Sequence, residues 1–221
     1  MHSLLAQLAE RRPVFHSEAD FQHALAWQCK LSSPEAEVRL EKQVTLQGSR
    51  AYLDLLVHSG KSEIAIELKY KVRAVKIVQA KEEYLLRNQS AQDIGRHDFL
   101  KDIERLENYV EEHTNSAAYA IMLTNDRTYW TESKKNDTVD TEFRLHEGKT
   151  VQGGATWGAK AAKGTKHKRE APISLRGKYS VHWCKYWSFG PDIADEFRYL
   201  LIHVPGYAVS SLNKSHFQQI D

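Results

Sequence analysis

Two neighbouring segments of the chain, residues 50–57 and 63–69, alternate side chains with the period of a β-strand. In the second segment the apolar residues fall on one face, and Glu67 and Lys69 fall on the other. In the first segment Asp54 lies among leucine and valine residues, where an isolated carboxylate is costly. The pattern therefore predicts two strands that each carry a carboxylate inside an apolar context.

The residues between the two strands predict how they pair. A two-residue Gly60-Lys61 loop suits a type II′ hairpin turn, which has glycine first. Asp54 then falls directly opposite Glu67, with Cβ atoms about 4.5–5.5 Å apart. At that separation two carboxylates can share one Mg²⁺, whereas a loop one residue longer or shorter would place them on opposite faces. The alternative is a set of cross-strand ion pairs on a wet sheet face.

A helix is predicted over residues 17–30, before the strands, with Ser17 as its N-cap. Glu18 and Gln22 fall on its inward apolar stripe, and buried polar residues need partners. Glu18 therefore either faces the paired carboxylates or is a first-turn acid that the helix dipole stabilises.

A second helix is predicted over residues 92–112. Gln92 and Arg96 fall on its buried stripe, so Arg96 either clamps a phosphate or catalytic carboxylate, or forms an ion pair that holds the helix to the sheet. The opposite side of this helix is expected to be solvated; its residues are Asp98, Lys101, Asp102 and Arg105.

The remaining pattern predicts an α/β fold. The order helix, three strands, helix, strand predicts a mixed central β-sheet flanked by helices on both faces. The other expected elements are helices at 3–10 and 81–87 and strands at 37–46, 117–124 and 127–132.

The last third of the chain differs in composition. Residues 148–172 are rich in glycine and lysine and are expected to form a long basic loop. A β-rich aromatic C-terminal extension follows at about 173–205, with strands at 178–189 and 196–204. Basic residues beside aromatic ones are typical of nucleic-acid surfaces, although such residues are equally often solvated loops and core. The basic candidates for substrate binding are Lys166, Lys168 and Arg169.

Length and charge set limits on these interpretations. The chain of 221 residues is expected to form one domain over 1–221, and its net charge of +2 confines any nucleic-acid binding to local patches. Two cysteines exclude a disulfide framework, and no zinc-binding spacing occurs. The start of the chain is too short and charged for a signal peptide or membrane span, so we expect a cytoplasmic protein without a membrane partner.

The chain carries Asp54, then twelve other residues, and then Glu67-Leu68-Lys69. This arrangement resembles the motif of the PD-(D/E)XK nuclease superfamily, although Leu53 replaces the proline. The resemblance covers about residues 14–130 and implies a restriction-endonuclease-like core. It implies that Mg²⁺, or Mn²⁺, is held by Asp54, Glu67 and the carbonyl oxygen of Leu68. It also implies that Lys69 holds the attacking water or the scissile phosphate, and that Glu18 is the glutamate that the family carries on its first helix.

The resemblance and the residues together predict a metal-dependent DNA endonuclease of a restriction, mobile-element or anti-phage system. Two alternatives stay open: a nuclease of the same fold acting on RNA or branched DNA, and a non-catalytic module that binds nucleic acid or protein. A partner protein would supply specificity, and a homodimer would suit double-strand cutting. The further candidates for substrate binding are Gln22, Lys71, Gln92 and Arg96.

Overall fold

The protein is described by a computed structural model that covers residues 1–190 and 195–206. The expected single domain over 1–221 also includes 191–194 and 207–221, which lie outside the described residues. The helices are α1 (His2–Arg11), α2 (Glu18–Ser32), α3 (Gln92–Glu112), the short α4 (Lys163–Lys166) and a 3-10 helix, η1 (Thr141–Phe143). The strands are β1 (Glu37–Leu46), β2 (Ser49–Ser59), β3 (Ser62–Lys71), β4 (Val75–Gln79), β5 (Glu82–Leu86), β6 (Ser116–Thr124), β7 (Thr150–Ala155), β8 (Ile173–Ser180), β9 (Trp183–Ser188) and β10 (Glu196–Val204).

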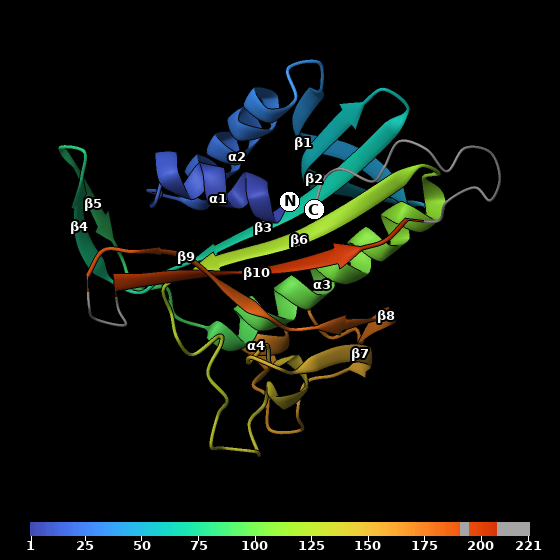
Figure 1. The fold of residues 1–221 in the computed structure, drawn as a ribbon. Coiled ribbons are helices and arrows are strands. Elements are labelled where there is room, and N and C mark those ends of the chain that lie inside the picture. Colours follow the sequence, from blue (N-terminus) through green and yellow to red (C-terminus); the bar gives the residue numbers. More distant parts are fainter. Residues whose placement is uncertain (191–194, 207–221) are drawn as a thin grey trace.

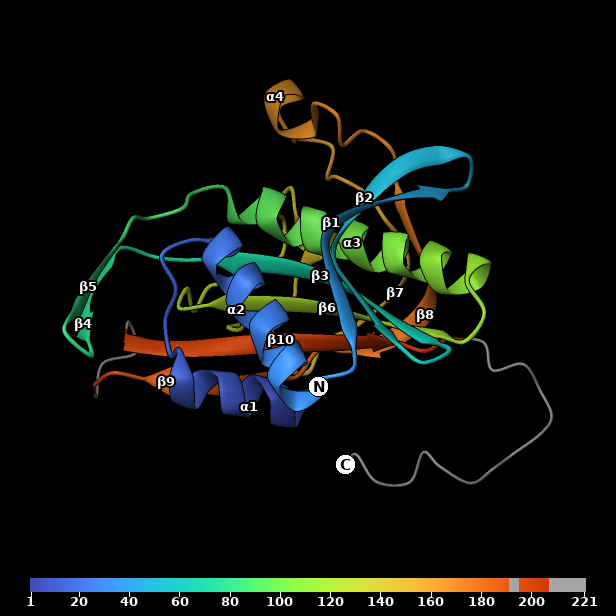
Figure 2. The same ribbon diagram turned by 90° about the horizontal axis from the view of Figure 1, so that it is seen from above.

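The centre of the fold is a six-stranded sheet in the order β1-β2-β3-β6-β10-β9. β3 and β6 are parallel, and the other neighbouring strands are antiparallel, so the sheet is mixed. α1 and α2 cover one face of the sheet and α3 covers the other (Figures 1 and 2). The predicted α/β class, with a mixed sheet between helices, is confirmed.

Each face of the sheet has its own hydrophobic core. Ile66 and Leu68 of β3 point toward α1 and α2 and pack with Phe21 and Leu25. Ala65, on the opposite face, packs among the apolar residues of α3 and of β7 and β8. The alternation of β3 therefore sends Glu67 and Lys69 toward α3, the same side as Ala65.

The C-terminal region is β-rich, as expected, and it completes the central sheet through β10 and β9. β7 and β8 form a separate two-stranded sheet that packs against α3 (Figure 1). Tyr179, Trp183 and Tyr186 are buried, so these aromatic residues serve packing and do not form an exposed stacking surface. Within the described residues, every helix is too short or too polar to span a lipid bilayer.

The helix expected over residues 81–87 is wrong, because the chain forms strand β5 there. β4 and β5 are joined by Ala80 and Lys81, whose φ angles of +50° and +69° give the twist of a type I′ hairpin turn. Such turns normally carry asparagine or glycine, so the Ala-Lys sequence gave no hairpin signal.

The strand expected over residues 127–132 is also wrong, and β10 takes its place beside β6. The carboxylate of Asp126 accepts hydrogen bonds from the backbone and hydroxyl of Thr128, at 3.0 and 2.8 Å, and folds the chain into a turn. The aromatic residues Tyr129 and Trp130, which favour strands, are buried within this turn.

The segment 148–172, expected to be a loop, contains β7 and α4. Gly153 has a φ of +68° at the point where the β7–β8 register shifts, as in a β-bulge. The glycines that suggested a loop therefore allow an irregular strand.

Candidate active site

The β2–β3 hairpin has the predicted register. Its pairs run from Ser59 and Ser62 to Leu55 and Ile66, and one further step places Asp54 opposite Glu67. Gly60 begins the turn with a φ of +60°, as a type II′ turn requires. The Oδ2 atom of Asp54 accepts a hydrogen bond of 2.6 Å from the backbone N–H of Leu68, which fixes this carboxylate against β3.

α2 brings a third carboxylate to the same place. Ser17 caps the helix as predicted, with its hydroxyl oxygen accepting from the N–H of Asp20 at 3.1 Å. In the first turn, the Oε2 atom of Glu18 accepts a hydrogen bond of 2.6 Å from the backbone N–H of Tyr70 on β3. Glu18 is therefore directed at the strand that carries Glu67, in agreement with the interpretation of an inward-facing acid.

Gln22, one turn further along α2, supports the site through the backbone. Its Nε2 atom donates to the carbonyl oxygen of Asp54 at 2.7 Å and to the Oε1 atom of Glu41 at 2.8 Å. Glu41 has a φ of +48°, which is uncommon for a residue with a side chain. Gln22 thus positions the strand that carries Asp54.

α3 contributes two residues that the sequence analysis wrongly placed on a solvated face. Asp102 is 3% exposed and forms an ion pair with the ammonium group of Lys69. The guanidinium group of Arg105 donates a hydrogen bond of 2.8 Å to the Oε1 atom of Glu67 and lies 3.3 Å from Asp102. The polar side of α3 therefore faces the strands of the site.

These contacts form a stripe along α3, because residues spaced by three or four share one helix face. Asp98, Asp102 and Arg105 lie on this stripe. Asp98 binds a residue of the basic segment, whereas Asp102 binds Lys69 of β3 and Arg105 binds Glu67 of β3. Near the end of the helix, Glu112 accepts a hydrogen bond of 2.8 Å from the backbone N–H of Gln47, in the β1–β2 turn. The stripe consequently links the basic segment, the hairpin and the β1–β2 ribbon.

We define the charged cluster as six residues that interact electrostatically: Glu18, Asp54, Glu67, Lys69, Asp102 and Arg105. The cluster holds four carboxylates and two cations, so its full ionisation leaves two uncompensated negative charges. Two of its carboxylates are buried, with 2% of the Glu67 side chain and 5% of the Asp102 side chain exposed, whereas Glu18 and Asp54 are half-buried. A divalent cation would balance the cluster.

Two acids of the cluster, Glu67 and Asp54, have raised pKa values. Burial raises the pKa of Glu67 well above its ordinary value, and the nearby charges of Asp102 and Asp54 raise it further, against the opposing effect of Arg105. Burial also raises the pKa of Asp54, although the Leu68 N–H and the charge of Lys69 oppose this shift. Without a metal, ionising both carboxylates therefore costs free energy.

Lys69, in contrast to these acids, keeps its charge at neutral pH. Burial favours the neutral amine, but the charge and hydrogen bond of Asp102 outweigh it, and the charges of Glu18 and Glu67 add to the effect. The pKa of Lys69 is consequently raised, and the side chain is an ammonium ion at neutral pH. It can donate hydrogen bonds, but it cannot accept a proton while Asp102 holds it.

The raised pKa of Glu67 predicts how stability depends on pH. A carboxyl group with a higher pKa in the folded state binds more protons there, so the free energy of unfolding falls as pH rises above 4.5, the ordinary value. In EDTA, the Tm of a Glu67→Gln variant relative to the wild type should therefore increase between pH 5 and pH 8. Thermal melts at each pH measure this difference, and a constant difference would contradict the assigned shift.

The donor set of the cluster suits Mg²⁺. Among the residues of 1–190 and 195–206, no three His, Cys, Asp or Glu side chains lie close enough to hold a metal ion by themselves. Mg²⁺ commonly binds through one or two carboxylates and keeps several waters or substrate oxygens, so Asp54 and Glu67 provide a sufficient protein contribution. The Leu68 carbonyl oxygen already accepts a hydrogen bond of 3.1 Å from Lys69.

The substrate-binding candidates on α3 lie elsewhere. Arg96 is buried and donates to Asp140 at 2.7 Å and to the carbonyl oxygen of Thr128 at 2.6 Å, which is the structural ion pair given as its alternative. Gln92 donates to Asp126 at 2.9 Å. These contacts hold the start of α3 to the segment after β6, and none of them involves a residue of the charged cluster.

The basic candidates divide into two groups. Lys71 is half-buried at the end of β3, two residues beyond Lys69. Lys166, Lys168 and Arg169 lie in the segment between β7 and β8, where Arg169 forms an ion pair of 2.8 Å with Asp98 on α3. The basic segment is therefore attached to the same helix that supplies Asp102 and Arg105.

Comparisons of the chain with protein-family models, with curated proteins and with solved structures find no match. The functional interpretation accordingly rests on the residues and contacts of the charged cluster and on the resemblance of its motif.

Proposed function

We propose that this protein is a metal-dependent nuclease of the PD-(D/E)XK type that hydrolyses phosphodiester bonds of DNA. The observation that carries the proposal is the charged cluster, in which four carboxylates meet two cations beside a strand register that opposes Asp54 and Glu67. With all four carboxylates ionised, the cluster has an excess of two negative charges, which is costly beside the buried Glu67 and Asp102 unless a cation or protonation balances it. The order α2-β1-β2-β3-α3-β6, with the β4–β5 hairpin inserted between β3 and α3, supports a restriction-endonuclease-like core.

Asp54 and Glu67 are the proposed ligands of Mg²⁺ or Mn²⁺, with the Leu68 carbonyl oxygen as a further donor. Two hydrogen bonds already orient these carboxylates: the Leu68 N–H binds Asp54, and Arg105 binds Glu67. When bound, the metal supplies charge neutralisation at the phosphate and a water of lowered pKa.

Lys69 is proposed to hold the attacking water or the scissile phosphate through its ammonium group. Asp102 keeps this group charged, which favours electrostatic stabilisation of the developing negative charge and disfavours a role as general base. Hydrolysis forms a bond from the water oxygen to phosphorus and breaks the bond from phosphorus to the 3′ oxygen, and the 3′ oxygen takes up a proton as the water loses one. The products are then a 5′-phosphate and a 3′-hydroxyl group, as the resemblance implies.

One observation favours a second candidate, a nuclease-like module that binds nucleic acid or protein without cutting. Glu67 and Lys69 are each engaged by an ion pair with α3, as they would be in a purely structural network. Under this alternative the pairs persist when metal and substrate are offered, and no cleavage occurs.

A cleavage panel separates the two candidates. The full chain is incubated with plasmid, linear, single-stranded and branched DNA and with RNA, in Mg²⁺, in Mn²⁺ and in EDTA. We expect cleavage that requires metal and that falls about 10²-fold in Lys69→Ala, because an ammonium group that acts on the reacting phosphate is lost.

Lys61→Ala is the matched control, because Lys61 is an exposed lysine in the turn of the same hairpin. It should cleave like the wild type. Equal activity in both lysine variants would contradict the role of Lys69. Cutting of RNA alone would replace DNA as the substrate class, and cutting of branched DNA alone would restrict the substrate to DNA junctions.

A further inference from the structure

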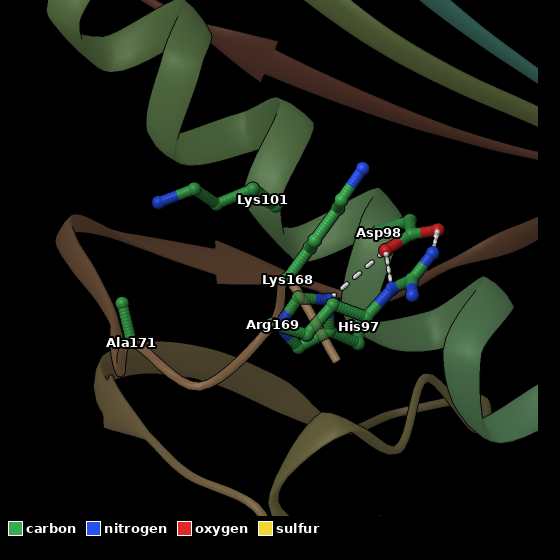
Figure 3. A pocket seen from close by; sticks show the side chains of 6 residues that line it. All are labelled: His97, Asp98, Lys101, Lys168, Arg169 and Ala171. Carbon is green, nitrogen blue, oxygen red and sulfur yellow. Dashed lines mark hydrogen bonds and ion pairs between the residues drawn. The ribbon is translucent and has the colours of Figure 1, made fainter. Parts of the chain in front are cut away.

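A small basic pocket lies beside the charged cluster, between the first half of α3 and the segment that leads into β8 (Figure 3). Its volume is about 200 Å³. The residues that line it are His97, Asp98, Lys101, Lys168, Arg169 and Ala171.

The wall of the pocket that faces α3 is held in place by several contacts. The guanidinium group of Arg169 binds both oxygens of Asp98, at 2.8 and 3.1 Å, and the Arg169 carbonyl accepts a hydrogen bond of 3.0 Å from the indole of Trp157. The Trp157 ring in turn stacks on His97, with centroids 5.2 Å apart. The segment is therefore fastened to α3 by charge, hydrogen bonding and stacking together.

The pocket carries an excess of positive charge. Three cationic side chains line it against one carboxylate, and that carboxylate, Asp98, is already bound by Arg169 and by His97 at 3.0 Å. Although burial opposes it, these hydrogen bonds lower the pKa of Asp98 below its ordinary value, so Asp98 is ionised and matched to Arg169. Lys168 then remains to attract an anion, together with Lys101, which the anion would share with Glu104. The side chain of Lys101 is 47% exposed and that of Glu104 is 14% exposed, and Glu104 also accepts a hydrogen bond of 2.7 Å from the Ser174 N–H.

Lys168 is presented by an unusual backbone conformation. Its φ of +62° lies in the left-handed region, which residues with side chains seldom adopt, and it is exposed. Strained backbone of this kind occurs preferentially at ligand-binding positions. Lys168 belongs to the segment and Lys101 to the helix. In Figure 3 their ammonium groups point in different directions, so both exposed side chains would turn toward a bound anion.

The size of the pocket restricts the ligand. Cavities that enclose small organic ligands usually measure about 300–1,000 Å³, whereas a single phosphate group requires less space and only positive donors. The one aromatic group of the lining, His97, is buried against Trp157 and Phe143 and has no free face for a base. These features match a phosphate group whose remaining parts lie outside the pocket.

We propose that this pocket binds a backbone phosphate of the nucleic acid, next to the phosphate that the charged cluster cleaves. This inference rests on the proposed nuclease function. Asp98 and Asp102 are one turn apart on α3, which corresponds to about 6 Å along the helix axis. Phosphates of one strand follow at about 3.4 Å of axis length, so phosphates one or two steps apart along a strand span this spacing on α3.

The test measures binding separately from cleavage. Affinities for a fluorescent DNA duplex are determined by anisotropy in EDTA, between 50 and 200 mM salt, for the wild type and for Lys101→Ala/Lys168→Ala. We expect about tenfold weaker binding and a salt slope reduced by about 0.9, the value for one lost phosphate contact on duplex DNA. The matched control is Lys76→Ala/Lys185→Ala, which removes two exposed lysines from β4 and β9, and it should change affinity less than twofold.

The outcomes distinguish this inference from the nuclease function. Pocket and control variants that bind alike would overturn the pocket, even if the wild type cleaves DNA. Pocket-dependent binding without cleavage by the wild type would support the pocket and overturn the nuclease. Inorganic phosphate and a mononucleotide serve as further probes. Either of them could raise the Tm of the wild type as much as the duplex does, and the pocket variant could abolish this increase. In that case the ligand is a small phosphate compound and the proposal is wrong.

Discussion

Replacing Glu67 with glutamine is expected to reduce metal-dependent cleavage by at least about 10³-fold while leaving the fold intact. Glutamine keeps the size of the side chain and can still accept the hydrogen bond from Arg105. It loses the charge that the proposed divalent cation would require, and several kcal/mol of the proposed stabilisation of the reaction would be lost with it. Initial rates of cleavage over a range of Mg²⁺ concentrations measure this effect.

The same substitution should preserve or increase stability at neutral pH. The raised pKa of Glu67 means that its ionised form is costly in the folded protein, and glutamine removes that cost. Lost activity together with an unchanged or higher Tm would separate a catalytic role from a structural one. A large fall in Tm would instead show that the carboxylate serves the fold.

Glu63→Gln is the matched control for this experiment. Glu63 is a glutamate at the other end of β3, bound to the hydroxyl group of Tyr109 at 2.6 Å and outside the charged cluster. Its variant should cleave at close to the rate of the wild type. Equal losses in the Glu63 and Glu67 variants would contradict a specific role for Glu67.

The part of the site carried by the hairpin could be predicted from the sequence, because its geometry is local. Strand alternation sets the faces of Glu67 and Lys69, and the Gly60-Lys61 turn sets the register that brings Asp54 opposite Glu67. Glu18 could be predicted for the same reason, since Ser17 marks where its helix begins. Each of these inferences needs only a few consecutive residues.

The contribution of α3 could not be predicted, because it depends on tertiary packing. Asp102 and Arg105 belong to a charged helix face that a sequence pattern assigns to solvent. The face is covered because α3 lies between the central sheet and the β7–β8 sheet, and β7 and β8 come from a segment that appeared to be a loop. The one available signal was the presence of unpaired acids and a lysine on β3, which needed partners from some other element.

Replacing Asp102 with alanine is expected to destabilise the protein by about 3 kcal/mol, because it removes the ion-pair partner of Lys69, whose ammonium group then has only the charges of Glu18 and Glu67 near it. For a chain of this size the Tm should fall by roughly 10 °C. Denaturant unfolding of the variant in EDTA measures the change in the free energy of unfolding. Asp137→Ala provides the control, because Asp137 and its partner Lys160 form an exposed ion pair, and its loss should cost at most about 0.5 kcal/mol.

A double variant, Lys69→Met/Asp102→Ala, tests the reason for this loss. If the loss of the ammonium's partner causes the destabilisation, replacing Lys69 as well should recover a large part of the lost free energy of unfolding. The protein with two substitutions would then be more stable than the protein with one. The double variant should remain inactive, because Lys69 is proposed to act on the phosphate. A double variant less stable than Asp102→Ala would mean that the two residues stabilise the fold independently, and Asp102 would then not be the residue that positions Lys69.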